Sequence, residues 1–183
     1  MLGFAPEGLK NDGSFHPLKI SLKNPGGSTV QARRGYYAPR HAVDAGEEAA
    51  EQILEAVFSS EAIHDIPLAL NMRYLKRGDF EATLSVVARV DPKDLRFRKD
   101  QGRSHDDLTI VAGIFDGNGN FLTGSQKTVE MHLRDQTLEA LSASGIRVGN
   151  TFDLTPGSYR VRVVARDAEG RRMAAVNGAI QIP

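Results

Sequence analysis

The sequence predicts a mainly β protein, in which a β-hairpin and one short helix precede a β-sandwich. Many short segments alternate apolar and polar residues, which is the period of half-buried strands. Clusters of Gly, Asn, Asp and Pro separate these segments, as turns require. A single segment has apolar residues at helical spacing, so the chain lacks the strand–helix alternation of a parallel sheet. Together these observations predict short strands arranged in a sandwich or a barrel.

The N-terminal segment, residues 1–42, contains the predicted hairpin. Leu18, Ile20 and Leu22 alternate with polar residues and predict a strand. Turn residues end this strand at 24–27, and a second strand follows. Residues 17–37 are therefore expected to form a hairpin whose apolar face needs a cover.

A connecting helix is predicted within residues 43–60. Asp44 is the expected N-cap, and Glu47 lies three residues later, which is the capping-box spacing. One apolar stripe follows at helical intervals, made of Ala50, Ile53, Leu54, Val57 and Phe58. This stripe is expected to pack on the neighbouring sheet.

Residues 61–183 contain the strands of the predicted sandwich. We expect turns at 76–79, 116–120 and 167–171, a mobile polar loop at 91–107, and a short helix or turn at 136–142. The residues expected to point into the core, strand by strand, are Ile66, Leu68, Leu70, Met72 and Tyr74, then Phe80, Ala82, Leu84, Val86, Ala88 and Val90, then Leu108, Ile110, Ala112 and Ile114, then Val129, Met131 and Leu133, then Tyr159, Val161, Val163 and Ala165, and last Ile180 and Ile182.

Composition excludes several functional classes. Lys and Arg number 23, as do Asp and Glu, so no net charge favours nucleic acid or acidic lipid as a partner. The absence of cysteine excludes disulfides, thiolate metal sites and cysteine nucleophiles. No apolar run reaches the roughly 18 residues that a membrane span needs. We therefore expect a soluble chain that binds no nucleic acid and does not insert into a membrane.

A short motif near the C-terminus refines the fold class. Residues 153–159 read DLTPGSY and lead into a strand of alternating valines. The motif resembles the leucine-x-proline-glycine-x-tyrosine entry into the penultimate strand of immunoglobulin-like and fibronectin type III-like domains. This resemblance implies an immunoglobulin-like β-sandwich in which Tyr159 packs at a corner and its hydroxyl bonds to backbone nearby.

The N-terminal segment carries a second resemblance. The stretches LGFAP at 2–6, DGSFHPLKI at 12–20 and QARRGYYAP at 31–39 look like the closing strands of the von Willebrand factor A-related proteins abundant in Acidobacteria. Members of that family continue through a helix into a sandwich that ends with a PGxYxxRV strand. The resemblance implies that residues 1–42 close an upstream von Willebrand A-related domain, which holds the family's adhesion-type metal site. It also implies a secreted or cell-envelope parent protein.

The turn at 116–120 has the look of a calcium loop but lacks its essential ligands. After DGNGN, Phe121 stands where such a loop needs glycine, and Lys127 stands where the closing carboxylate belongs. The sequence therefore predicts a hairpin turn that binds neither Ca²⁺ nor Mg²⁺.

No other motif predicts a catalytic or metal site. The histidines are His16, His41, His64, His105 and His132, and none forms a pair at the helical or strand spacing of metal ligands. His64 with Asp65 could meet His105 with its two neighbouring aspartates in space, although loop and strand-edge positions favour a plain polar role. No serine lies in a Gly-x-Ser-x-Gly elbow. Three aromatic residues could stack on a ligand, although core or interface packing is favoured for them: Tyr36, Tyr37 and Phe97.

We therefore expect a non-catalytic accessory or interaction module of a larger secreted or envelope protein, and we assign no catalytic, cofactor-binding or metal-ligating residue. The expected partner is a protein, with weak homo-association through the N-terminal hairpin. The alternative is a sandwich-fold hydrolase or carbohydrate-binding domain that uses loop carboxylates such as Asp106 and Asp107. Two carboxylates of perturbed pKa in a cleft would favour the hydrolase, and an exposed aromatic patch would favour the module.

Overall fold

The computed structural model describes residues 15–18, 35–37 and 45–183. The chain divides into two compact units, Met1–Ala49 and Ala50–Pro183.

The first unit contains the ends of the predicted hairpin. Strand β1 (Phe15–Pro17) pairs antiparallel with β2 (Gly35–Tyr37). Within the predicted range 17–37, this pairing joins Pro17 to Gly35, whereas Leu18 is not in a strand. Ile20, Leu22, the turn at 24–27 and the N-cap Asp44 lie outside the described residues.

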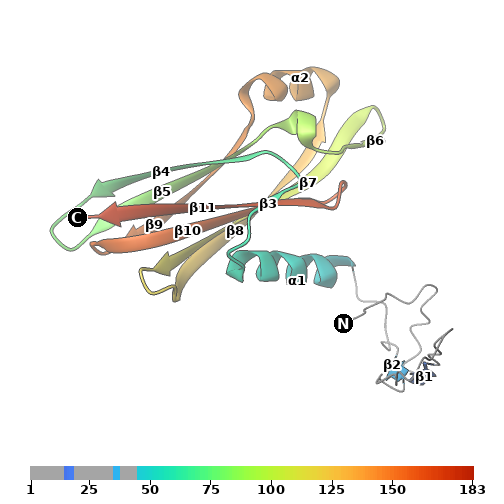
Figure 1. The fold of residues 1–183 in the computed structure, drawn as a ribbon. Coiled ribbons are helices and arrows are strands. Elements are labelled where there is room, and N and C mark those ends of the chain that lie inside the picture. Colours follow the sequence, from blue (N-terminus) through green and yellow to red (C-terminus); the bar gives the residue numbers. More distant parts are fainter. Residues whose placement is uncertain (1–14, 19–34, 38–44) are drawn as a thin grey trace, which may run out of the picture. The chain divides into compact units, whose positions relative to one another are not determined.

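The second unit is a sandwich of two antiparallel sheets, which Figure 1 shows as two layers. The smaller sheet has the order β4-β5-β9, and the larger has the order β3-β11-β10-β7, with β6 and β8 also paired to β7. The elements are α1 (Ala45–Phe58), β3 (Ile63–His64), β4 (Leu68–Lys76), β5 (Ala82–Val90), the 3-10 helix η1 (Pro92–Asp94), β6 (Arg98–Asp100), β7 (Arg103–Asp116), β8 (Phe121–Leu133), α2 (Asp135–Ser144), β9 (Ile146–Leu154), β10 (Gly157–Asp167) and β11 (Arg172–Ile182).

The strand order confirms the predicted immunoglobulin-like architecture. The chain crosses from the smaller sheet to the larger after β5, returns for β9, and crosses again for β10 and β11. Such crossings are the Greek-key connections of this sandwich class, and they place the penultimate strand in the middle of the larger sheet.

The main core lies between the two sheets and follows the predicted alternation. Along β5 and β7 the predicted inward residues are buried, and four of them on β7 have no exposed surface: Leu108, Ile110, Ala112 and Ile114. Residues of opposite sheets interdigitate there because each strand places every second side chain on the same face.

The outer face of the larger sheet is covered by α1, as Figure 1 shows. Ala56 and Val57 of the helix pack against Val164 and Ala175 of the central strands. Strand β10 is therefore buried on both faces over residues 161–165, where apolar residues occupy both faces at Val163, Val164 and Ala165.

The predicted helix stripe is wrong in part. Leu54 and Phe58 are 60% and 58% exposed, and Ala50 is exposed as well. The buried face instead centres on Ala56 and Val57, with Ile53 packed beside them. The apolar stripe spans more of the helix than the sheet covers, so its outer edge stays in solvent.

Several strand predictions also need correction. Strand β9 was not predicted, because Gly149 and Asn150 interrupt its apolar alternation. The segment 91–107 is not one loop, since it contains η1, β6 and the start of β7. Phe80 is 79% exposed and precedes β5 rather than lying in its buried row. The helix α2, in contrast, confirms the helical alternative at 136–142.

The tyrosine corner is present as predicted. Tyr159 is buried, and its hydroxyl donates to the backbone oxygen of Thr155 at 2.7 Å. This bond closes the turn between β9 and β10 and fixes the entry of β10 into the sheet.

Candidate functional site

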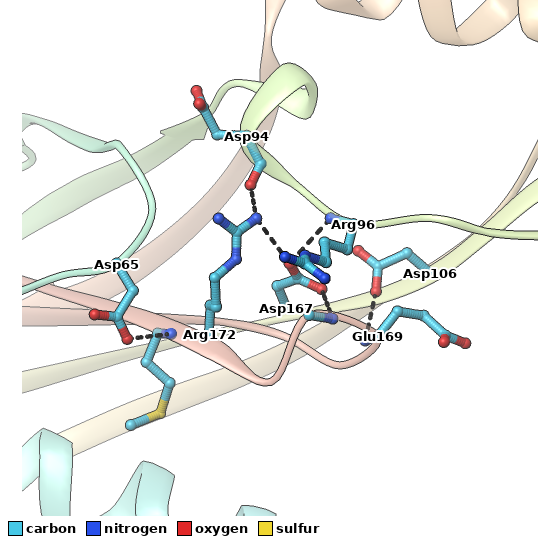
Figure 2. Close-up of polar contacts among 9 residues, drawn as sticks. Asp65, Asp94, Arg96, Asp106, Asp167, Glu169 and Arg172 are labelled. Carbon is cyan, nitrogen blue, oxygen red and sulfur yellow. Dashed lines mark hydrogen bonds and ion pairs between the residues drawn. The ribbon is translucent and has the colours of Figure 1, made fainter.

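A buried polar cluster lies where the turn between β10 and β11 meets the segment that follows β5 (Figure 2). Its centre is a pair of aspartates, Asp106 on β7 and Asp167 at the end of β10, which are 3% and 0% exposed. Buried carboxylates with altered acidity are common in active sites, so this cluster is the first candidate for chemistry.

Asp167 is surrounded by hydrogen-bond donors. One carboxylate oxygen, Oδ1, accepts from the backbone N–H of Gly170 at 2.7 Å. The other, Oδ2, accepts from the N–H of Arg96 at 3.1 Å and lies 3.5 Å from the guanidinium of Arg172. Arg172 also donates to the backbone oxygen of Asp94. The carboxylate thus joins the β10–β11 turn to the segment after β5, a structural use of a buried charge.

Asp106 has fewer hydrogen-bond partners than Asp167. Its Oδ1 accepts from the N–H of Glu169 at 3.2 Å, whereas its Oδ2 has no hydrogen-bond donor. Burial raises the pKa of Asp106 to about 6, and the negative charge of Asp167 adds to this effect. When Asp106 is protonated, its carboxyl group can donate a hydrogen bond to the Asp167 carboxylate, whereas the ionised form has no proton to donate.

Asp106 has the raised pKa of a catalytic acid, but neither carboxylate is accessible to a substrate. Both side chains lie in the interior, and the hydroxyl of Ser104 beside them is buried without a partner. A general acid must come within hydrogen-bond distance of its substrate, and these carboxylates are covered by the protein itself. The cluster is therefore suited to holding two segments together.

Asp106 and Asp107 do not form the pair of loop carboxylates that the hydrolase alternative would need. Asp106 and Asp107 are neighbours on β7 and not in a loop, so their side chains point to opposite faces. Asp106 is buried and Asp107 is exposed. The suggested meeting of His64 with His105 is wrong too, since β11 and β10 separate their strands β3 and β7.

In the turn at 116–120, which resembles a calcium loop, the Asp116 carboxylate accepts hydrogen bonds from the turn itself. Oδ1 of Asp116 accepts from the N–H groups of Asn118 and Asn120, at 2.9 and 2.8 Å. Oδ2 accepts from the side-chain amide of Asn120 at 2.8 Å. These hydrogen bonds lower the pKa of Asp116, the side-chain amide of Asn120 most of all. Lys127 donates to the backbone oxygen of Gly149 on β9, far from any role as a closing ligand.

A second buried charge fastens α1 to the sheet. Arg162 of β10 is 2% exposed, and burial lowers its pKa. Its Nε donates to the backbone oxygen of Ala56 at 2.9 Å, and its Nη2 donates to that of Glu61 at 2.6 Å. A cation is favourable at the carbonyl of Ala56 because the C-terminal end of a helix carries partial negative charge.

An aromatic cluster lies at the exposed edge of the same helix. The ring of Phe58 is 5.9 Å from that of Phe115 and 5.6 Å from that of Phe121, measured between centroids. Phe121 is 46% exposed and Leu122 is 48% exposed. Beside the cluster, Phe58, Phe115 and Arg160 help to line a hollow of about 220 Å³. We call Leu54, Phe58, Phe115 and Phe121 the aromatic edge.

The remaining candidates have ordinary surroundings. Phe97 packs against the main core, which agrees with the structural alternative for this residue. Ser125 donates to the side chain of Asn150 at 2.9 Å. The side chains of Tyr36 and Tyr37 lie outside the described residues. No helix in the described part of the chain has the length and apolar character to cross a membrane.

The sequence analysis missed one pair of residues that the fold brings together. His105 of β7 and His132 of β8 lie directly opposite each other, and their Nδ1 atoms are 2.6 Å apart. They are 27 residues apart in the chain, so local spacing gives no sign of the pair. The register of the β7–β8 hairpin is the signal that would have shown it.

Comparison with known proteins adds information about the fold alone. No family model and no curated protein matches the sequence. Among solved structures, a calcium binding mutant of Bacteroides uniformis beta-glucuronidase 2 is 15% identical with a TM-score of 0.42, over 62% of this chain and 13% of that one. A glycosyl hydrolase family 2 member from Bacteroides cellulosilyticus is 11% identical with a TM-score of 0.44, over 66% of this chain and 15% of that one. The chain therefore spans only a small part of the length of these enzymes.

Proposed function

We propose that this chain is a non-catalytic module of a larger secreted or cell-envelope protein and that it binds another protein. The main observation behind the proposal is that Asp106 and Asp167 are buried and inaccessible to a substrate. These carboxylates have the environment of an acid–base pair, yet they lie at 3% and 0% exposure and hydrogen-bond to the chain's own backbone. A hydrolase would need them at the wall of a cleft.

The aromatic edge supports the interaction part of the proposal. Phe58 and Leu54 are more than half exposed, and Phe121 continues the same apolar surface across β8. Exposed aromatic residues that adjoin one another are typical of surfaces that a protein partner buries. A partner with its own aliphatic or aromatic side chains fits this edge.

The secreted location rests on the resemblance of residues 1–42 to von Willebrand factor A-related proteins. It is tested by fractionating cells of the source organism and detecting the parent protein with an antibody against the sandwich. Recovery in the envelope or medium is expected, and recovery in the cytoplasm would overturn this part.

The catalytic alternative is tested with nitrophenyl β-glucuronide, β-galactoside and β-glucoside at pH 5 to 8. We expect no release of nitrophenol above that of buffer, because substrate cannot reach the carboxylates. Turnover by the wild type that disappears in Asp106→Asn and persists in Asp107→Asn would show that the chain is a hydrolase. Asp107→Asn is the matched control because it removes the same charge from the exposed face of β7.

Sedimentation velocity over a range of protein concentrations distinguishes the two candidate interaction surfaces, the N-terminal hairpin and the aromatic edge. We propose weak homo-association through the N-terminal hairpin, so Ile20→Ser should lower the association and Phe58→Ser should leave it unchanged. If Phe58→Ser abolishes the association instead, the aromatic edge is the self-binding surface and the hairpin assignment is wrong. A strict monomer at high concentration would contradict homo-association altogether.

A further inference from the structure

The histidine pair on the β7–β8 hairpin has the geometry of an incomplete metal site. His105 and His132 are a directly opposed cross-strand pair. Their ring centroids are 4.5 Å apart, the ring planes meet at 83°, and the two Nδ1 atoms approach to 2.6 Å. Two imidazoles thus turn the same kind of ligand atom toward a common point.

The pair lies on the outer face of the sheet, within reach of solvent. Ser104, Asp106 and Met131 alternate with the histidines and are buried in the interior. His132 is exposed and His105 is partly exposed. An ion can therefore approach the pair without opening the core.

The backbone holds both histidines in place. The ladder between β7 and β8 continues on both sides of the pair, from Ser104 with Leu133 to Asp106 with Met131. The guanidinium of Arg103 donates to the backbone oxygen of His132 at 3.2 Å. Ligands on paired strands lose less conformational entropy on binding than ligands on loops, which favours chelation.

We propose that His105 and His132 chelate a divalent transition-metal ion of the Cu²⁺, Ni²⁺ or Zn²⁺ type through their Nδ1 atoms. Nitrogen ligands bind such ions at about 2.0–2.1 Å, so two of them around one ion stand roughly 3 Å apart. The present 2.6 Å separation reaches this value when the exposed rings move apart by a few tenths of an ångström. Imidazole prefers these ions to Ca²⁺ and Mg²⁺, and the Irving–Williams order places Cu²⁺ first.

The protonation states of the rings are compatible with binding. In the neutral pair one Nδ1–H donates to the other Nδ1. When the ion takes both Nδ1 atoms, the donor ring keeps its proton on Nε2 instead, so the exchange of tautomers releases no net proton. Asp107 and Glu130 form the next outward-facing pair along the ladder, and their carboxylates add attraction for a cation.

The site is bidentate and open. Among the residues that the structure describes, no group of three or more His, Asp or Glu side chains gathers around one point. Water therefore completes the coordination of the bound ion, and the affinity is expected to be that of an exchangeable site and not of a structural zinc centre. This inference does not depend on the proposed function.

The test is a titration of the untagged chain with CuCl₂, followed by calorimetry and by ¹H–¹⁵N NMR of the histidine rings. We expect one ion per chain, and paramagnetic Cu²⁺ should broaden the ring signals of His105 and His132 first. His105→Ala and His132→Ala should each lower the affinity for Cu²⁺ by at least about tenfold, because each variant loses one of the two nitrogen ligands. His64→Ala is the matched control, since His64 is another exposed histidine on a strand.

Three results would overturn the proposal, the third from a parallel titration with Mg²⁺. One is binding that persists unchanged in both His105→Ala and His132→Ala, and a second is the absence of selective broadening in the wild type. The NMR measurement needs no substitution, so it decides the question even if a variant fails to fold. Equal responses to Cu²⁺ and Mg²⁺ would also contradict it, because imidazole chelation distinguishes the two ions.

Discussion

Replacing Asp106 by asparagine should stabilise the sandwich at neutral pH. The carboxylate is 3% exposed, its Oδ2 has no donor, and Asp167 lies beside it. Asparagine is of similar size, carries no charge, and can donate from its amide to the Asp167 carboxylate. It can also keep the bond from the N–H of Glu169 through its own oxygen.

The magnitude follows from the pKa of Asp106. Folding raises this pKa from 3.8 to about 6, so the folded state holds a proton that the unfolded chain has released. Stability therefore falls as pH rises from about 4 to about 6, and it stays at the lower level above that range. About two pKa units at about 1.4 kcal/mol each amount to about 3 kcal/mol.

The assay is urea denaturation of wild type, Asp106→Asn and Asp107→Asn at several pH values from 4 to 8. The difference in unfolding free energy between Asp106→Asn and wild type should increase by about 3 kcal/mol between pH 4 and pH 7 in favour of the variant. Asp107→Asn removes a charge from the exposed face and should show no comparable rise. A difference between Asp106→Asn and wild type that does not change with pH would refute the reasoning, because the charged form of Asp106 would then cost nothing.

Three further predictions address the corner, the turn and the segment after β5. Tyr159→Phe should lower the unfolding free energy by about 1–2 kcal/mol in urea melts, since the bond to Thr155 is lost in a buried place; an unchanged midpoint would count against the corner. Calorimetry with Ca²⁺ or Mg²⁺ should show no specific heat, and a melting-temperature rise abolished by Asp116→Ala would reveal a site there. Asp167→Ala should speed tryptic cleavage after Arg96, which lies between η1 and β6, because the N–H of Arg96 and the guanidinium of Arg172 lose their acceptor. An unchanged rate of cleavage there would contradict the role of Asp167.

Alternation alone was enough to predict most of the sandwich. Strands β5, β7 and β10 alternate apolar residues along the face that is buried, and the predicted inward residues within their bounds are buried. The inward predictions for Phe80, which precedes β5, and for Tyr74 of β4 were wrong, since these side chains are exposed. Burial of one face imposes this pattern directly, so it can be read from the chain. Strand β9 was not predicted because one of its buried positions is polar: Asn150, whose side chain accepts a hydrogen bond from Ser125.

The buried polar cluster could not be predicted in the same way. Asp106, Asp167 and Arg172 come from separate strands, and each looks like an ordinary polar residue near a turn. Their burial depends on how η1 and the β10–β11 turn come together, which is a long-range property of the fold. For this reason the charge-rich segment 91–107 was expected to be a solvated loop, although Asp167 binds the backbone of Arg96 within it.

The histidine pair shows how one irregularity decides what a surface can bind. The β7–β8 ladder shifts register between Ile114 and Phe115, so that Phe115 faces Phe121 while Ile114 faces Thr123. Without this bulge the same hairpin would set His105 opposite Met131, and His132 would point into the core. A one-residue shift exchanges the two faces of a strand because side chains alternate with a period of two. The bulge therefore places Met131 in the interior and both imidazoles on the outside. Leu122 is the extra residue of the bulge, so deleting it should leave His105 opposite His132 and keep Cu²⁺ binding, whereas inserting one residue between Leu122 and Thr123 without a second bulge should separate the two imidazoles.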